Sequence, residues 1–285
     1  MHWSFLLSLV TLLMLPSIAT WSQDKIFDVH IHGNPQPPQQ IDELQEAGVY
    51  KVAVSTSWNL QQQYKTDKLS VLYGLMLPCP LGKVPYSGQQ CFGDGQEWPS
   101  LAWTEGEIKK GNIQFLGEVL SQYYGISSSD SMLLPYYALA NKYNLPVGIH
   151  TGSAGQNHGC PNFSERLGDP LLMRDLLQKI PTLKVWIMHA GVPYLEEAIQ
   201  LMKEYPHVYA DISAINNPEI IPGDYFHSFM KQLIDNGLED RIMFGSDNNS
   251  IEVTINSVKR LSFLTQAQKQ KIFFKNAERL FSRVP

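Results

Sequence analysis

The chain has 285 residues and a formal net charge of -5, from 22 Lys and Arg against 27 Asp and Glu. Proteins that bind nucleic acid neutralise phosphates with clustered Lys and Arg, so this acidic balance argues against a nucleic-acid partner. We therefore expect a small-molecule substrate. The sequence leaves the oligomeric state open, and a homo-oligomer is compatible with it.

The first 19 residues have the pattern of a secretory signal peptide. Residues 5–15 are almost unbroken apolar sequence, and Ser17 and Ala19 stand where a small-x-small cleavage site is expected. This stretch is shorter than the ~20 residues that span a bilayer. Because Lys and Arg are missing before it, a buried amphipathic helix is the alternative. We predict a leader at 1–19, a mature chain at 20–285 without a membrane segment, and a secreted or periplasmic protein.

Short β-rich runs alternate with helical stretches along the mature chain. Strands are predicted at 25–33, 50–57, 71–78, 113–119, 146–152, 184–191, 208–213 and 241–248, and helices at 37–48, 129–144, 170–180, 194–204, 224–237 and beyond 249. This alternation indicates a parallel sheet. Eight such units in one chain of this length favour a single-domain α/β fold, the closed (β/α)8 TIM barrel, over a doubly wound open sheet.

The longest connection, at 79–112, contains two cysteines and two tryptophans. Cys79 and Cys91 enclose a Pro- and Gly-rich loop that a disulfide can close, with up to ~3 kcal/mol of stabilisation in the chain-entropy model. Two free thiols are the alternative, and Cys160 is left over. A loop of this length is usually functional, so we expect a wall or lid over a pocket. The connection after the fifth strand adds His158 and Arg166 as candidate substrate-binding residues.

Polar residues fall at the carboxyl ends of six predicted strands, where barrels of this type form their active sites. They are His30 and His32, Glu118, His150, His189, Asp211 and Asp247. Each has a purely structural alternative, such as a hydrogen-bonded histidine or a helix cap. If the barrel closes, however, all seven side chains point into one rim, and leaving them without partners costs several kcal/mol. A divalent cation is the simplest partner that satisfies them together.

The first histidine pair has a geometry that suits a metal ion. Residues i and i+2 of a strand face the same side, so His30 and His32 both project into the barrel while Val29 and Ile31 pack outward. Two imidazoles can then bind one ion at the ~2.0–2.1 Å that zinc prefers. Asp247 can add a carboxylate from across the barrel mouth.

Six ordered motifs resemble the amidohydrolase superfamily, in its group of metal-dependent hydrolases. They are DVHIHG, LGEV, GIHTG, MHAG, FGSDN and the closing NAERLF. The resemblance covers nearly the whole mature chain and implies a TIM barrel that binds one or two divalent ions, with zinc expected. It implies metal ligation by His30, His32, His150 and Asp247.

Two positions in the resemblance leave alternatives open. His189 either completes a second metal site or hydrogen-bonds the developing oxyanion of the substrate. Many two-metal members bridge their ions with a carbamylated Lys at the end of the fourth strand, where this chain has Glu118. A Glu bridge makes two ions feasible, and a single ion with Glu118 nearby is the alternative.

The predicted function is hydrolysis of a small carboxylic ester, lactone or amide. A zinc ion activates water and polarises a carbonyl, Asp247 is the expected acid–base group, and His189 is the expected oxyanion partner. A metal-dependent decarboxylase of aromatic acids is the main alternative, because Arg166 or Arg174 can hold a carboxylate. Phosphodiester cleavage and a non-catalytic metal-binding barrel are further alternatives.

Overall fold

The computed structural model describes residues 25–83, 91–93, 97–153 and 160–282. Eight parallel strands pair in chain order to form one sheet. The strands are β1 (Ile26–His32), β2 (Val49–Thr56), β3 (Ser70–Leu75), β4 (Phe115–Val119), β5 (Val147–Ile149), β6 (Val185–Ile187), β7 (Val208–Asp211) and β8 (Ile242–Met243).

Backbone hydrogen bonds bring the first strand against the segment that ends the sheet. The amide of Val29 donates to the carbonyl of Phe244 at 3.1 Å, and the amide of Asp247 donates to the carbonyl of His30 at 2.8 Å. The predicted (β/α)8 TIM barrel is therefore confirmed.

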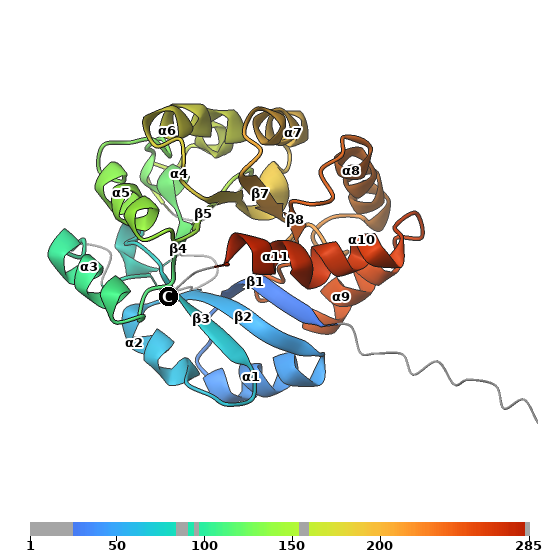
Figure 1. Cartoon of the computed structure of the whole chain (residues 1–285), viewed down its shortest axis with the longest axis horizontal. Helices are drawn as coiled ribbons and strands as arrows, with labels where there is room; N and C mark the ends of the chain where they lie inside the picture. Colours follow the sequence, from blue (N-terminus) through green and yellow to red (C-terminus); the bar gives the residue numbers. More distant parts are fainter. Residues whose placement is uncertain (1–24, 84–90, 94–96, 154–159, 283–285) are drawn as a thin grey trace, which may run out of the picture.

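Helices surround the barrel between successive strands (Figure 1). The α-helices are α1 (Pro37–Glu46), α2 (Trp58–Gln61), α3 (Leu101–Lys109), α4 (Ser121–Tyr124), α5 (Leu134–Lys142), α6 (Met173–Lys179), α7 (Leu195–Glu204), α8 (Gly223–Asp235), α9 (Ile251–Lys259), α10 (Gln266–Gln270) and α11 (Asn276–Leu280). Shorter helical turns are η1 (Gln62–Tyr64), η2 (Pro80–Gly82), η3 (Glu165–Gly168), η4 (Pro170–Leu172), η5 (Met188–Gly191) and the π-helical η6 (Lys271–Lys275). No helix among the described residues has both the length and the apolar character needed to cross a membrane.

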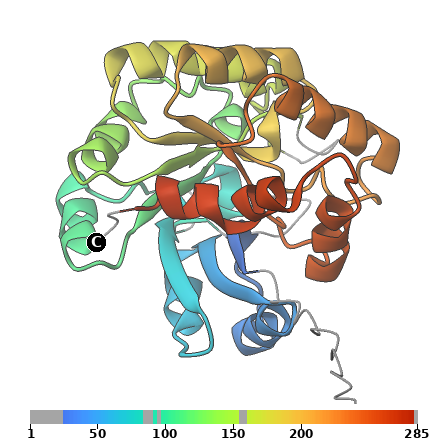
Figure 2. The ribbon, with the colours of Figure 1, turned by 45° about the vertical axis from the view of Figure 1, so that its right-hand side comes forward.

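An apolar cluster fills the barrel interior at the amino-terminal ends of the strands. It takes side chains from seven of the strands and from the end of the chain: Phe27, Val29, Ala53, Leu72, Phe115, Trp186, Met188, Tyr209, Met243, Ala277, Leu280 and Phe281. On β5, Gly148 leaves space for the indole, because a Cβ there would lie 2.4 Å from Trp186 Cζ2. Helix α11 crosses this end of the barrel (Figures 1 and 2). In barrels of this type, ligands bind at the opposite, carboxyl-terminal end.

The structure corrects the predicted orientation of Val29. Ile31 packs in the outer core as predicted, but Val29 belongs to the interior cluster. The pairing of β1 with β2 shifts register between Asp28 and Ile31. Such a bulge breaks the strict alternation of faces, so that Val29 and His30 both point inward.

The long connection after β3 also differs from its prediction as an extended loop. It contains α3, whose amino end is capped by the Ser100 hydroxyl, which accepts a hydrogen bond from the amide of Trp103 at 3.2 Å. Cys79 and Cys91 form a disulfide with a Cα–Cα distance of 5.9 Å. The disulfide packs with Met76, Leu120, Tyr123 and Cys160, and Tyr123 packs edge-on against His150 at 5.3 Å between ring centroids.

We expect Phe281→Ala to destabilise the barrel by ~3–5 kcal/mol, the usual cost of truncating a buried Phe. The ring is 4% exposed and lies 5.3 to 5.8 Å from the rings of Phe27, Phe115 and Trp186, between centroids. Chemical denaturation measures the change. Met132→Ala is the control, because Met132 is 48% exposed and its loss should cost less than ~0.5 kcal/mol. Equal effects of the two variants would show that packing of the Phe281 ring does not stabilise the barrel.

Candidate metal centre

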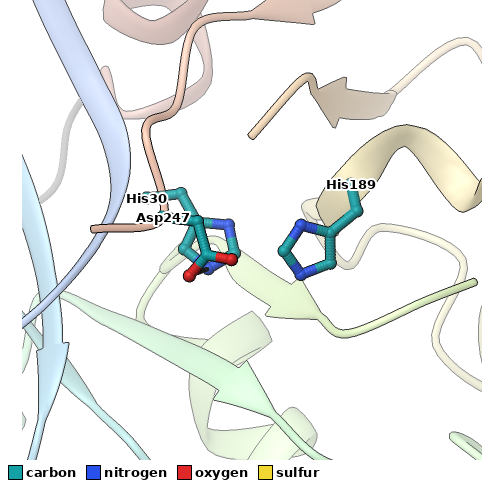
Figure 3. Close-up of side chains that lie close together, drawn as sticks. All are labelled: His30, His189 and Asp247. Carbon is teal, nitrogen blue, oxygen red and sulfur yellow. Dashed lines mark ion pairs between the residues drawn. The ribbon is translucent and has the colours of Figure 1, made fainter. Parts of the chain in front are cut away.

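Six side chains named by the sequence converge at the carboxyl-terminal end of the barrel. They are His30 and His32 on β1, Glu118 on β4, His150 directly after β5, His189 on η5, and Asp247 after β8. Three overlapping groups place their ligand atoms within 4.8 Å of one another: His30, His189 and Asp247; His30, His32 and Glu118; and Glu118, His150 and His189. Figure 3 shows the first group, with the His30 and His189 rings facing one another and the Asp247 carboxylate beside His30.

The Glu118 carboxylate lies between two pairs of imidazoles. Its Oε2 is 3.2 Å from His32 Nε2 and 3.9 Å from His30 Nε2. Its Oε1 is 3.3 Å from His189 Nε2 and also contacts His150 Nδ1. Each carboxylate oxygen therefore faces its own histidine pair, which is the arrangement of a bridging ligand.

Asp247 joins the same cluster from β8. Its Oδ1 lies 3.1 Å from His32 Nε2 and 3.7 Å from His30 Nε2. The Asp247 side chain is 26% exposed, whereas those of the four histidines and Glu118 are at most 10% exposed. Asp247 is thus the member of the cluster that solvent and a substrate reach most readily.

Two of the six side chains reach the cluster through unusual backbone. His189 and Asp247 lie beyond the ends of β6 and β8 rather than within them, and their φ values are +58° and +51°. Non-glycine residues are uncommon in this left-handed region, and they concentrate at functional sites. The turn after each strand takes the place of the longer strand that the sequence predicted.

An outer layer of polar groups holds the first histidine pair. His32 Nδ1 donates to the backbone carbonyl of Ser55 at 3.0 Å, and its backbone amide donates to the Asn248 side chain at 2.9 Å. His30 Nδ1 lies 3.1 Å from an oxygen of Asp211, which is completely buried. Because Gly245 lacks a side chain, it allows this packing, since a Cβ there would lie 2.9 Å from the Cβ of His30.

Charge compensation determines the ionisation of the cluster. Burial alone would lower the pKa of His32 and His189, but their hydrogen bonds to carboxylates outweigh it: Asp247 and Glu118 raise the pKa of His32 to about 10, and Glu118 with Asp247 raises that of His189 to about 9. Burial likewise opposes ionisation of Glu118, yet His150 and the other imidazoles hold its pKa well below the usual range. Glu118, His32 and His189 therefore favour their charged forms when no other cation is near, whereas burial lowers the pKa of His150.

The residues fit a divalent cation. Imidazole nitrogens and carboxylate oxygens are the ligands that zinc uses in catalytic sites. His150 also has a buried Nε2 atom with no hydrogen-bond partner in the described part of the protein, although its Nδ1 contacts Glu118. Four imidazoles and two carboxylates within so small a volume lose much of their hydration, and a cation compensates that loss.

Two other residues that the sequence predicted, Arg166 and Arg174, do not join this cluster. His158 lies outside the described residues. Arg166 is exposed on η3, and Arg174 pairs on the outer surface with Glu204, with Nε 2.7 Å from Oε2. Arg174 is therefore excluded from the site by its place on α6.

Sequence reasoning missed three groups that organise the site. Ser213 and Trp186 both contact Asp211, and Asn248 anchors the backbone of His32. Asn248 was visible as a polar neighbour of Asp247, but Trp186 reads as an ordinary core residue of a strand. Ser213 follows the seventh strand, where a serine usually indicates only a turn.

The family of the chain is shown by a comparison with family models. Residues 116–283 match the family model described as amidohydrolase. No curated protein matches the chain. An uncharacterized TIM-barrel protein from Bordetella bronchiseptica is similar in structure, with a TM-score of 0.64 and 17% identity over 91% of this chain and 99% of that chain.

Two similar structures carry enzyme names. A probable 2-pyrone-4,6-dicarboxylic acid hydrolase from Acinetobacter baumannii has a TM-score of 0.61 and 14% identity, over 90% of this chain and 98% of its own. The 5-carboxyvanillate decarboxylase from Sphingomonas paucimobilis has a TM-score of 0.61 and 12% identity, over 92% of this chain and 100% of its own. At these identities the likeness shows the shared barrel fold. The family match covers more than half of the chain, and the chain therefore belongs to the amidohydrolase family of enzymes.

Proposed function

We propose that this protein is a metal-dependent hydrolase that cleaves an ester, lactone or amide bond of a small molecule. The observation that carries the proposal is the placement of Glu118, whose two oxygens face separate histidine pairs. A carboxylate so placed can bridge two divalent ions, and zinc suits the nitrogen-rich ligand set.

The residues divide naturally between two ions. His30, His32, Asp247 and Glu118 Oε2 would hold the first ion, and His150, His189 and Glu118 Oε1 would hold the second. When bound, such ions polarise a carbonyl group and make water more acidic. The contact of His189 Nε2 with Glu118 supports its role as a ligand over its role as an oxyanion partner.

Asp247 is the proposed acid–base group. Burial opposes its ionisation, but the hydrogen bond from His32 and the nearby imidazoles hold the pKa of Asp247 below its usual range. It is therefore a carboxylate at neutral pH and can accept a proton. Its exposed position lets it take the proton from an attacking water and return it to a leaving alkoxide or amine.

The second candidate function, decarboxylation of an aromatic acid, is supported by similarity to decarboxylases of the same fold. A carboxylate substrate calls for a bidentate cation such as Arg. Of the two arginines that the sequence offers for this role, Arg174 is engaged by Glu204 and Arg166 is exposed. We therefore propose hydrolysis first and keep decarboxylation as the second candidate.

The disulfide supports export of the protein. Disulfides persist in oxidising compartments and are rare in reducing ones, and Cys79–Cys91 is such a bond. Together with the leader pattern at 1–19, it supports a secreted or periplasmic location. Amino-terminal sequencing of exported protein checks this, and recovery of the intact leader from the cell interior alone would contradict it.

We expect purified protein to bind about two divalent ions per chain, as in other sites with a bridging carboxylate. Glu118→Gln should lower this number, because an amide has one acceptor oxygen and cannot bridge. Elemental analysis after equilibration with zinc and gel filtration measures the ratio. Glu107→Gln is the matched control, because Glu107 is a buried glutamate on α3 that pairs with Lys110. One ion per chain in the unaltered protein would refute the bridging arrangement.

We expect Asp247→Asn to lower kcat for ester, lactone or amide hydrolysis by roughly 10²- to 10⁴-fold, the usual contribution of a general acid–base group. Rates are measured per bound zinc, so that lost metal is not mistaken for lost catalysis. Asp235→Asn, at an exposed carboxylate on α8 that pairs with Lys231, is the control and should keep full activity. Release of CO2 from aromatic acids, with no hydrolysis of any tested bond, would replace hydrolysis with the decarboxylase function.

A further inference from the structure

Asp211 and Ser213 form a hydrogen-bond network with two of the proposed metal ligands, His30 and His189. The acid–base chemistry proposed above does not use this network. Asp211 is completely buried and accepts five hydrogen bonds. One oxygen accepts from the amide of His189 at 3.1 Å, the amide of Ser213 at 3.0 Å and the Ser213 hydroxyl at 2.6 Å. The other accepts from Trp186 Nε1 at 3.0 Å and faces His30 Nδ1 at 3.1 Å.

The direction of these hydrogen bonds follows from the donors. Backbone amides and an indole N–H can only donate, so Asp211 must be the acceptor. Both oxygens of Asp211 accept from such fixed donors, and the Ser213 hydroxyl lies 2.6 Å from one of these oxygens. Ser213 therefore donates its single proton to Asp211.

Ser213 Oγ can then only accept from its remaining neighbours. His30 Nδ1 lies 2.8 Å from it and His189 Nδ1 lies 3.0 Å from it. Both Nδ1 atoms must therefore carry a proton, and both Nε2 atoms are left with lone pairs toward Glu118 when the rings are neutral. One hydroxyl thus accepts from a histidine of each proposed ion site, and a second acceptor supports each tautomer: Asp211 for His30, and the Ser213 carbonyl, at 3.3 Å, for His189.

We propose that Asp211 and Ser213 are positioning residues that fix His30 and His189 as Nδ1–H tautomers and so prepare ligands for both ions at once. The inference rests on the proposed function, because it assumes that the cluster binds metal. It adds that the Ser213 hydroxyl contacts one histidine ligand of each ion. Hydrogen-bond partners of this kind orient metal ligands, and their loss typically costs roughly 10- to 100-fold in metal affinity.

Two variants test the network in different ways. Ser213→Ala removes the shared acceptor, and we expect roughly 10- to 100-fold weaker zinc binding at both sites. In Asp211→Asn, the amide NH2 group takes the place of the oxygen that faces Trp186 Nε1 and His30 Nδ1. Because this group is itself a donor, it cannot accept from either nitrogen. We expect His30 to shift toward the Nε2–H tautomer, which cannot bind an ion through Nε2. Ser128→Ala is the control, because Ser128 is buried and its hydroxyl has no partner among the described residues.

Zinc affinity is measured by competition with a chromophoric chelator, and tautomers by ¹⁵N NMR of labelled histidines at a pH where the imidazoles are neutral. Metal-free protein is included, so the tautomers can be read even if the protein binds no zinc. Nδ1–H signals for both histidines in the unaltered protein, with that of His30 lost in Asp211→Asn, together with weaker binding in both variants, would support the inference. Unchanged tautomers, or Ser213→Ala binding zinc as tightly as Ser128→Ala, would overturn it. Failure to hydrolyse any substrate with zinc bound would instead count against the proposed function alone.

Discussion

The site depends on one requirement, which is that the buried carboxylate of Glu118 must have partners that compensate its charge. A charge removed from water is costly unless partners compensate it. Here four imidazoles surround one carboxylate that is 3% exposed, with a second carboxylate, Asp247, at the edge. The imidazoles can serve this role only when their Nε2 or Nδ1 atoms point at the carboxylate. The remaining polar contacts of the site, from Ser55, Asp211 and Asn248, supply that orientation.

The barrel separates this polar centre from its stabilising core. Large apolar side chains fill the interior near the amino-terminal ends of the strands, and α11 covers them. The functional groups occupy the opposite end, where strand ends and short turns place them on rigid backbone. This division allows a dense group of charges to exist without weakening the apolar packing, because the two regions share strands but few side chains. Trp186 is the exception, since its ring packs in the core while its N–H reaches Asp211.

Much of this organisation could be predicted from the sequence, because the responsible signals are periodic. Alternating apolar strands and helices predict the barrel, and polar residues at strand ends predict the six clustered side chains. The failures have local causes. The positive φ values of His189 and Asp247 do not alter the pattern of polar and apolar residues. The bulge near Val29 is likewise not predicted by the alternation of inward and outward residues along a strand. The helix at 101–109 mixes polar and apolar residues without a clear face. Ser213 matters through one hydroxyl, which no pattern of residue types indicates.

The closure of the barrel by contacts between β1 and the segment after β8 has a consequence for the order of biosynthesis. The amide of Asp247 bonds to the carbonyl of His30, so the first and last contributors to the centre meet only when nearly the whole chain has left the ribosome. An ion encountered earlier would find an incomplete ligand set that lacks the Asp247 carboxylate. The Cys79–Cys91 bond spans just 12 positions and has no such delay. Oxidation of the cysteines can therefore precede assembly of the metal centre. We expect metal to bind in the last stage of folding.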